Sequence, residues 1–283
     1  MNNMLLIDDS KYKAMTFSGG ERHIELLVSD EDLVKYPDIV IEKRVQSAND
    51  IMDILLLNEI LRRKNVNSVS LKMLYIPYAR QDRATTPNTP RALKVFADLM
   101  NSCNFRDVFV LDPHSMVAEN LINNMRQLNV VPYIKEFMNK MGFTNQNTIL
   151  VSPDVGAIKK VERYAKELGI TDVMAFHKER NPATGEIKGI KIIQDVADID
   201  HRNILVVDDI CDGGRTFIEL VKSCTDLQPF AGRTLNLFVT HGIFSYGLQP
   251  LIDAGFQNIG CTDSFIPSLQ CVRENKELTI INA

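Results

Sequence analysis

The stretch Ile204-Leu205-Val206-Val207-Asp208-Asp209-Ile210-Cys211-Asp212-Gly213-Gly214-Arg215-Thr216 joins a run of apolar residues to two acids and then to two glycines. The first four residues are apolar and mostly β-branched, which predicts a strand buried in a parallel sheet. Apolar residues recur at helical spacing from Thr216 onward, which predicts that a helix follows the glycines. A strand, a tight loop and a helix in this order are the unit from which α/β folds are built.

The loop after this strand has the chemistry of a ribose-phosphate site. Carboxylates at the end of a buried strand are costly unless something uses them, and Asp208 and Asp209 lie where the vicinal hydroxyls of a sugar would be. Gly213 and Gly214 allow backbone N–H groups to turn inward, and the helix start adds a partial positive charge, so that the loop forms a phosphate cradle. The residues therefore indicate a ribose 5-phosphate site, with a plain strand and a solvated acidic turn as the alternative.

Composition limits the classes of protein that fit. The chain has 283 residues, 45% of them hydrophobic, which is enough for two domains. A net charge of -4 argues against a general nucleic-acid surface, and the sequence has no apolar run of membrane length and no signal-like start. Five cysteines without a Cys-x-x-Cys pair favour a reducing compartment, which predicts a cytoplasmic protein, and argue against a structural zinc site.

Periodicity outlines the remaining elements. Strands are expected at residues 4–7, 38–42, 69–76, 108–111, 147–151, 173–176, 234–239, 259–261 and 278–281, and a hairpin at 12–28 that turns at Gly19-Gly20. Helices are expected at 47–63, 90–102 and 133–141, with Ser47 or Asn49 as the N-cap of the first. This alternation predicts two α/β domains, 1–131 and 132–283, each a mainly parallel sheet flanked by helices.

The glycine loop resembles the ribose-phosphate-binding loop of type I phosphoribosyltransferases and of ribose-phosphate diphosphokinases. The segment Pro77-Tyr78-Ala79-Arg80-Gln81-Asp82-Arg83 is similar to one that marks the diphosphokinases and that simple phosphoribosyltransferases lack. Arg80 and Arg83 offer planar, permanently charged donors for a triphosphate, and Gln81 offers an amide for the nucleotide. On these residues the chain is identified as a member of the ribose-phosphate diphosphokinase (phosphoribosyl pyrophosphate synthetase) family, with two domains of the phosphoribosyltransferase type.

Two further segments of the first domain carry the resemblance. Phe17-Ser18-Gly19-Gly20-Glu21 is similar to a hairpin segment that in the family reaches the ATP site of a neighbouring subunit. The resemblance implies that Phe17 stacks on adenine and that Glu21 meets its amino edge. Asp112-Pro113-His114-Ser115 is similar to the family's Asp-Leu-His-Ala, which implies that His114 contacts Mg²⁺ or phosphate with the support of Asp112.

The second domain adds two more segments. Ser152-Pro153-Asp154-Val155-Gly156-Ala157 is similar to the family's Ser-Pro-Asp-Ala-Gly-Gly, which implies that Asp154 approaches the ribose and Mg²⁺. Lys178 and Arg180 match a Lys-x-Arg pair that the family carries on a mobile loop, and the resemblance implies that they stabilise the transferring group.

The implied reaction is the transfer of diphosphate from Mg–ATP to the anomeric hydroxyl of a ribose phosphate, with release of AMP. The implied catalytic residues are Lys178 and Arg180, and the implied metal contacts are His114 and Asp154. The implied ATP-binding residues are Phe17, Glu21, Arg80, Gln81, Arg83 and His114. The implied ribose-phosphate-binding residues are Asp154, Asp208, Asp209, Asp212, Gly213, Gly214, Arg215 and Thr216. The partners implied are small molecules and further copies of the chain, as a dimer or a hexamer.

The sequence also departs from the family pattern. The family's first strand–helix unit is largely missing before Phe17, and the family usually continues with a helix beyond Ala283. The loop from Asp212 to Thr216 replaces the family's Asp-Thr-(Cys or Gly)-Gly-Thr, so that Gly213 lacks a hydroxyl and Arg215 adds a cation. This change favours an acceptor with a larger or more charged 5′ end, such as ADP-ribose, and hence a role in NAD metabolism; the alternative is an Arg215 that points to solvent or bonds an ordinary 5-phosphate.

Two other interpretations stay open at this point. One is a catalytically silent homologue that regulates an active synthase, against which the retained Lys178, Arg180 and His114 argue. The other is a base-using phosphoribosyltransferase, against which the segment 77–83 argues.

Overall fold

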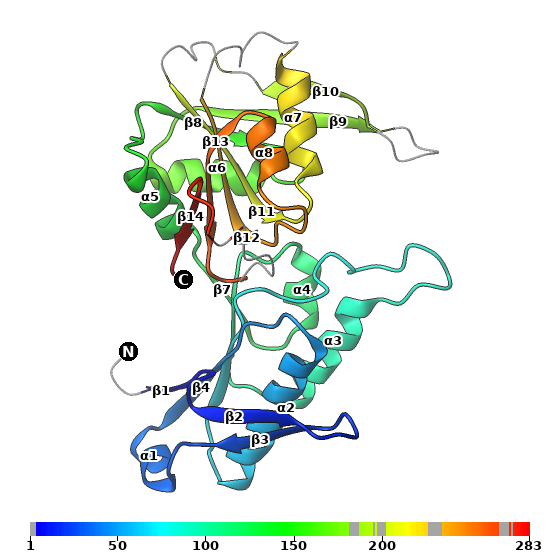
Figure 1. Ribbon diagram of the computed structural model, residues 1–283, viewed down its shortest axis with the longest axis vertical. Coiled ribbons are helices and arrows are strands. Elements are labelled where there is room, and N and C mark those ends of the chain that lie inside the picture. Colours follow the sequence, from blue (N-terminus) through cyan, green and yellow to red (C-terminus); the bar gives the residue numbers. More distant parts are fainter. Residues whose placement is uncertain are drawn as a thin grey trace. The chain divides into compact units, whose positions relative to one another are not determined.

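The structure is a computed structural model, and it describes residues 4–180, 187–194, 196, 202–225, 234–265, 272 and 274–283. The chain divides into two compact units, Met1–Asn129 and Val130–Ala283 (Figure 1). Among the helices of the described residues, none combines the length and the apolar character that a membrane span requires.

The first unit is built on a five-stranded parallel sheet with the order β1-β4-β5-β6-β7. Its strands are β1 (Met4–Ile7), β4 (Asp38–Glu42), β5 (Val69–Lys72), β6 (Val108–Leu111) and β7 (Met125–Leu128). Its helices are α1 (Asp30–Lys35), α2 (Ala48–Arg63), α3 (Ala92–Ser102) and α4 (Met116–Leu121). An antiparallel hairpin of β2 (Tyr12–Thr16) and β3 (Arg22–Leu26) packs on α2 through β3 (Figure 1).

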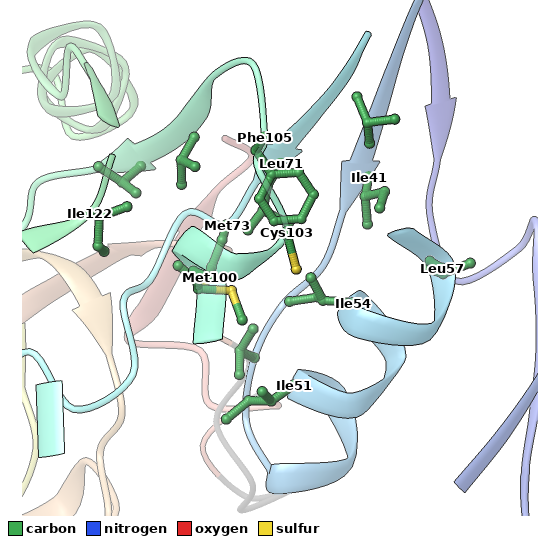
Figure 2. Packing of buried hydrophobic residues seen from close by; sticks show 14 of the residues in the cluster. Ile41, Ile51, Ile54, Leu57, Leu71, Met73, Met100, Cys103, Phe105 and Ile122 are labelled. Carbon is green, nitrogen blue, oxygen red and sulfur yellow. The ribbon is translucent and has the colours of Figure 1, made fainter. Parts of the chain in front are cut away.

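Helix α2 shows how the sequence builds this unit. The Ser47 hydroxyl accepts a hydrogen bond from the backbone N–H of Asp50, and the backbone N–H of Ser47 donates one to the Asp50 carboxylate, which forms a capping box at the helix start. The apolar residues of α2 recur at helical spacing and are buried against the sheet and α3. Figure 2 shows Ile54 and Leu57 of this face close to Ile41 of β4.

The second unit is built on a seven-stranded sheet with the order β10-β9-β8-β11-β12-β13-β14, in which only the β9–β10 pair is antiparallel among the described strands. Its strands are β8 (Thr148–Ser152), β9 (Val173–Arg180), β10 (Ile187–Gln194), β11 (Asn203–Cys211), β12 (Leu235–Gly242), β13 (Phe256–Thr262) and β14 (Leu278–Ile281). Its helices are α5 (Val131–Lys140), α6 (Ile158–Leu168), α7 (Arg215–Thr225) and α8 (Gln249–Asp253).

These sheets confirm the predicted α/β class with parallel sheets flanked by helices. Four strands, at 4–7, 38–42, 108–111 and 278–281, have the predicted bounds, and the predicted helix at 47–63 is present with Ser47 as its cap. The strand predicted at 69–76 ends earlier, at Lys72, and the helix predicted from Thr216 begins one residue earlier. The elements α1, α4, α8, β7 and β10 were not predicted.

Two of the unpredicted elements, α1 and β7, lack the signals that periodicity supplies. Helix α1 has six residues and buries only Leu33, so its sequence has no apolar face to detect. Strand β7 reads Met-Arg-Gln-Leu and lies at a sheet edge, where one neighbouring strand is enough to hold it. Such short elements depend on their neighbours in the fold more than on their own sequence.

Candidate functional site

The end of β11 lies at the point where the second sheet reverses its direction of growth. From β8 the chain passes through α6 to β9 on one side, and from β11 it passes through α7 to β12 on the other. Strand β11 pairs with β8 only as far as Val206, whereas its pairing with β12 continues to Cys211. The connections that leave β8 and β11 therefore diverge, and at such a switch point parallel α/β sheets typically bind ligands in a crevice beyond the carboxyl ends of the strands.

Three acids, Asp208 and Asp209 in β11 and Asp154 in the turn after β8, are electrostatic neighbours. Asp209 is buried, and its Oδ2 lies 3.2 Å from Nζ of Lys160 on α6. Asp208 accepts a hydrogen bond from the backbone N–H of Asp209 at 2.9 Å. Burial raises the pKa of Asp208 well above its usual range, and the charges of Asp209 and Asp154 act in the same direction, whereas Lys160 opposes them. Asp209 and Asp154 oppose the ionisation of Asp208, and a bound cation or hydroxyl donors would relieve this repulsion.

The loop between β11 and α7 has the backbone of an anion cradle. Gly214 has φ +75°, a conformation that favours glycine, and its carbonyl accepts the N–H of Phe217 in the first turn of α7. The loop is held from β12, because Ile243 donates its N–H to Cys211 O at 2.8 Å and Ser245 donates to Asp212 O at 3.1 Å. The helix start after Gly214 then supplies N–H groups and a partial positive charge.

Arg215 points along its helix. Its side chain is 79% exposed, and its Nε lies 2.7 Å from Oε1 of Glu219, one turn further along α7. This is the solvent-directed arrangement that the sequence left as an alternative.

Asp154 closes the turn that follows β8. Its Oδ1 accepts the N–H of Ala157 at 3.2 Å, and its backbone carbonyl accepts the hydroxyl of Ser152 at 2.8 Å. The electrostatic contact with Asp208 places it in the same crevice.

The predicted ATP-binding residues lie in the first unit on three segments. Phe17 is at the tip of the β2–β3 hairpin with its side chain 49% exposed, and its ring centroid lies 5.4 Å from that of His23. A Cβ at Gly19 would lie 2.6 Å from Oε2 of Glu21, so that glycine at this position leaves room for the Glu21 carboxylate. The turn is closed by the N–H of Phe17, which donates to Glu21 O at 2.9 Å.

The other two segments follow neighbouring strands of the first sheet. The exposed side chains of Arg80, Gln81 and Arg83 come after β5, and exposed His114 comes after β6, which pairs with β5. Asp112 is fully buried and has φ +43°, a strained conformation of a kind that clusters at functional sites. The sheet therefore brings these two segments to one edge, at the carboxyl ends of its strands.

The structure corrects the expectation for Lys178 and Arg180. Their backbone belongs to β9, where Lys178 pairs with Ile190 and Arg180 with Ile187 in an antiparallel hairpin with β10, and not to a loop. Their side chains lie outside what the structure describes, as does the turn-rich segment 181–185. The described residues contain no group of three histidine, cysteine, aspartate or glutamate side chains arranged to hold a metal by themselves.

Comparison with known proteins tests the resemblance. Residues 2–104 match the family model of the N-terminal domain of ribose phosphate pyrophosphokinase, and residues 122–225 match that of the phosphoribosyl transferase domain. The chain belongs to the ribose-phosphate pyrophosphokinase family.

Relatives and a solved structure agree with this membership. The chain is 27% identical over 262 residues to the ribose-phosphate pyrophosphokinase of Mycoplasmopsis pulmonis, a match that covers 91% of this chain and 78% of the relative. It is 28% identical over 232 residues to that of Aquifex aeolicus, which covers 81% and 71%. The crystal structure of phosphoribosylpyrophosphate synthetase from Mycobacterium smegmatis has the same fold, with a TM-score of 0.75 at 17% identity over 99% of this chain and 95% of that one.

Two residues next to the acids and the glycine loop of the second unit were not singled out by the sequence analysis. Lys160 is one of two adjacent lysines at the start of α6, and nothing in the sequence tells which of them faces Asp209. Tyr246 lies against the glycine loop, because a Cβ at Gly213 would come within 2.9 Å of its ring. It follows the end of β12 at Gly242, and nothing in the neighbouring sequence marks it as part of a site.

Proposed function

We propose that this member of the ribose-phosphate pyrophosphokinase family transfers diphosphate from Mg–ATP to the anomeric hydroxyl of a ribose phosphate and releases AMP. The observation that carries the proposal is the acidic crevice of Asp154, Asp208 and Asp209 next to the glycine loop at the switch point of the second sheet. Carboxylates for the sugar hydroxyls and backbone N–H groups for the phosphate are the two recognition elements that a ribose phosphate requires.

Each group of residues has a role in this proposal. Asp208 and Asp209 accept hydrogen bonds from the ribose hydroxyls, while the amides of Gly213 and Gly214 and the hydroxyl of Thr216 hold the phosphate with the loop that begins at Asp212. On the ATP side, the adenine is bound by Phe17 and Glu21. The triphosphate and the rest of the nucleotide are bound by Arg80, Arg83, Gln81 and His114. Lys178 and Arg180 stabilise the charge on the transferring group.

A divalent cation fits the charge of the crevice. Asp154, Asp208 and Asp209 are electrostatic neighbours there with Lys160 opposing them, and Mg²⁺ is typically held by one or two carboxylates together with water and substrate oxygens. Asp154 and His114 are the proposed contacts. When bound, Mg²⁺ supplies neutralisation of the charge on the triphosphate and orients it.

For the acceptor, we propose a ribose phosphate with an extended 5′ end, of which ADP-ribose is the representative, and hence a role in NAD metabolism. This proposal is supported by Gly213, which has no hydroxyl to close the phosphate pocket, and by the exposed cation of Arg215 at the same loop. The pairing of Arg215 with Glu219 leaves ribose 5-phosphate as the competing acceptor. The proposal further includes a cytoplasmic homo-oligomer, a dimer or a hexamer.

The deciding experiment measures AMP release from ATP and Mg²⁺, with ribose 5-phosphate and ADP-ribose offered separately. Turnover with either acceptor, lost in Asp209→Asn but kept in the control Asp253→Asn on α8, supports diphosphate transfer. If neither acceptor leads to AMP release, diphosphate transfer is refuted and a silent regulatory homologue is left. Product from phosphoribosyl diphosphate and a base without ATP would instead identify a phosphoribosyltransferase.

A further inference from the structure

Tyr246 and Gly213 share one space at the mouth of the glycine loop. A Cβ built on Gly213 would lie 2.9 Å from Cε2 and 3.0 Å from Cδ2 of the Tyr246 ring, closer than real Cβ atoms come to other atoms. The ring therefore occupies the place where a side chain at position 213 would begin. A threonine at this position and the tyrosine at 246 exclude each other in this arrangement.

The ring is held there by its backbone. Phe244 is fully buried and has φ +49°, and Gly247 has φ +76°, so the segment between them turns sharply at a defined place. The N–H of Gly247 donates to Phe244 O at 2.9 Å and closes this turn, while Ser245 is hydrogen-bonded to Asp212 O at 3.1 Å. The backbone before Tyr246 is thus bonded to the glycine loop through Ser245, and the turn around Tyr246 is closed by its own hydrogen bond.

The Tyr246 side chain is nevertheless 77% exposed. The large exposed aromatic side chains of the described residues are Phe17, Tyr78 and Tyr246, and the first two lie in the segments proposed for ATP. An aromatic ring that is fixed at its backbone and open to solvent is a stacking platform for a nucleobase. Arg215, 79% exposed, leaves the same loop two residues after Gly213 and adds a planar cation suited to a second phosphate.

We propose that Tyr246 is a specificity residue which stacks on the base of a nucleotidyl group attached to the 5′ oxygen of the acceptor ribose. The glycine loop holds the first phosphate, Arg215 meets the second, and the ring of Tyr246 covers the base. This inference rests on the proposed function, because it assigns a subsite to the acceptor of the same reaction.

The test measures equilibrium binding of ADP-ribose and of ribose 5-phosphate by calorimetry without ATP, in the full-length wild type and in Tyr246→Phe, Tyr246→Leu and Tyr246→Ala. The leucine variant keeps a bulky side chain over Gly213 but has no π-face, and the phenylalanine variant keeps the π-face. We expect Tyr246→Leu and Tyr246→Ala to bind ADP-ribose roughly tenfold more weakly and Tyr246→Phe to bind it as the wild type does. Binding of ribose 5-phosphate should stay within about twofold in all three, because that ligand has no base to stack.

Two results would overturn the inference. Equal weakening of both ligands would mean that the ring only supports the loop, and unchanged binding of ADP-ribose in Tyr246→Ala would mean that the ring touches no ligand. AMP release, measured in parallel, separates the two proposals. Tyrosine-dependent binding of ADP-ribose without AMP release would leave the subsite standing and reject the reaction. AMP release with ribose 5-phosphate and no binding of ADP-ribose would support the reaction and reject the subsite.

Discussion

Asp53 on α2 is the centre of a buried ionic cluster, and its replacement by asparagine should loosen the hairpin that carries Phe17 and Glu21. The carboxylate is fully buried and receives two hydrogen bonds from Arg22 on β3, at 2.7 Å from Nε and 2.8 Å from Nη2. Lys43 lies 3.3 Å from the same carboxylate, and the hydroxyl of Tyr12 on β2 lies 3.4 Å from it. Both strands of the hairpin are therefore tied to α2 through one side chain.

The magnitude follows from what each partner retains after Asp53→Asn. Lys43 keeps Asp9 at 2.6 Å and Asp50 at 3.2 Å, so its charge stays compensated. Arg22 keeps a long hydrogen bond to the Thr16 hydroxyl at 3.5 Å, and its side chain is 19% exposed and reaches water. Breaking a buried ion pair typically costs 3–5 kcal/mol, and this partial exposure places the expected loss near the lower end, at about 3 kcal/mol.

The assay is thermal and urea unfolding, together with hydrogen exchange of residues 12–26. A loss of about 3 kcal/mol should lower the melting temperature by roughly 6–12 °C and speed up exchange in β2 and β3. The matched control is Glu59→Gln on the same helix. Glu59 forms an ion pair with Arg63, and because the two side chains are 61% and 66% exposed, this pair should contribute at most about 1 kcal/mol to the free energy of unfolding.

Two outcomes would refute this reasoning. One is an equal, small loss of stability in Asp53→Asn and Glu59→Gln, which would mean that the buried cluster contributes no more than a surface pair. The other is unchanged exchange in residues 12–26 despite a large loss of stability, which would mean that the hairpin is held by its apolar contacts alone.

Three further perturbations probe the second unit and the buried thiols. Burial and neighbouring acids raise the pKa of Asp208, so the folded state is not destabilised by this group below the ordinary aspartate pKa and loses stability as the pH rises from there through the raised value. Asp208→Asn removes this loss and should raise the melting temperature by about 2 °C or more at pH 8 but not at pH 4. Gly213→Thr should lower the melting temperature by pushing Tyr246 aside, and Tyr246→Gly in the same chain should restore part of that loss, which a double-mutant cycle would measure as non-additivity. Burial raises the pKa of Cys103 to about 11 and that of Cys261 to about 12, so peptide mapping after brief treatment with iodoacetamide at pH 8 should find both thiols unmodified until the protein is denatured.

The sequence was sufficient to predict an element where the residues of that element alone carry a clear pattern. The strand at β11 was found because four apolar residues precede the acids, and α2 because a cap residue precedes an amphipathic face. The predicted end of β11 was too early, since Asp208 to Cys211 are polar or mixed and are held in the strand only by continued pairing with β12.

The hairpin of β9 and β10 shows how a resemblance can mislead. The segment Ile187–Gln194 contains apolar residues at several positions, but the resemblance implied a mobile loop after Phe176 and no strand was predicted there. In the structure the two strands pair antiparallel from Ala175 to Arg180. Each strand supplies hydrogen bonds to the other, and this pairing could not be read from either segment alone.

Lys160 and Tyr246 could not be found from the sequence, because their roles arise from neighbours that lie far away along the chain. Lys160 is separated from Asp209 by 49 positions, and the fold brings them together only because β8 and β11 are adjacent and their connections diverge. Tyr246 meets Gly213 because β11 and β12 are also adjacent, so that the segments after both strands lie over the same crevice. The loss of a side chain at 213 and the ring at 246 are then one structural change and not two. A threonine at 213 would displace this ring from its place over the loop, so the identities of these two residues are coupled in this structure.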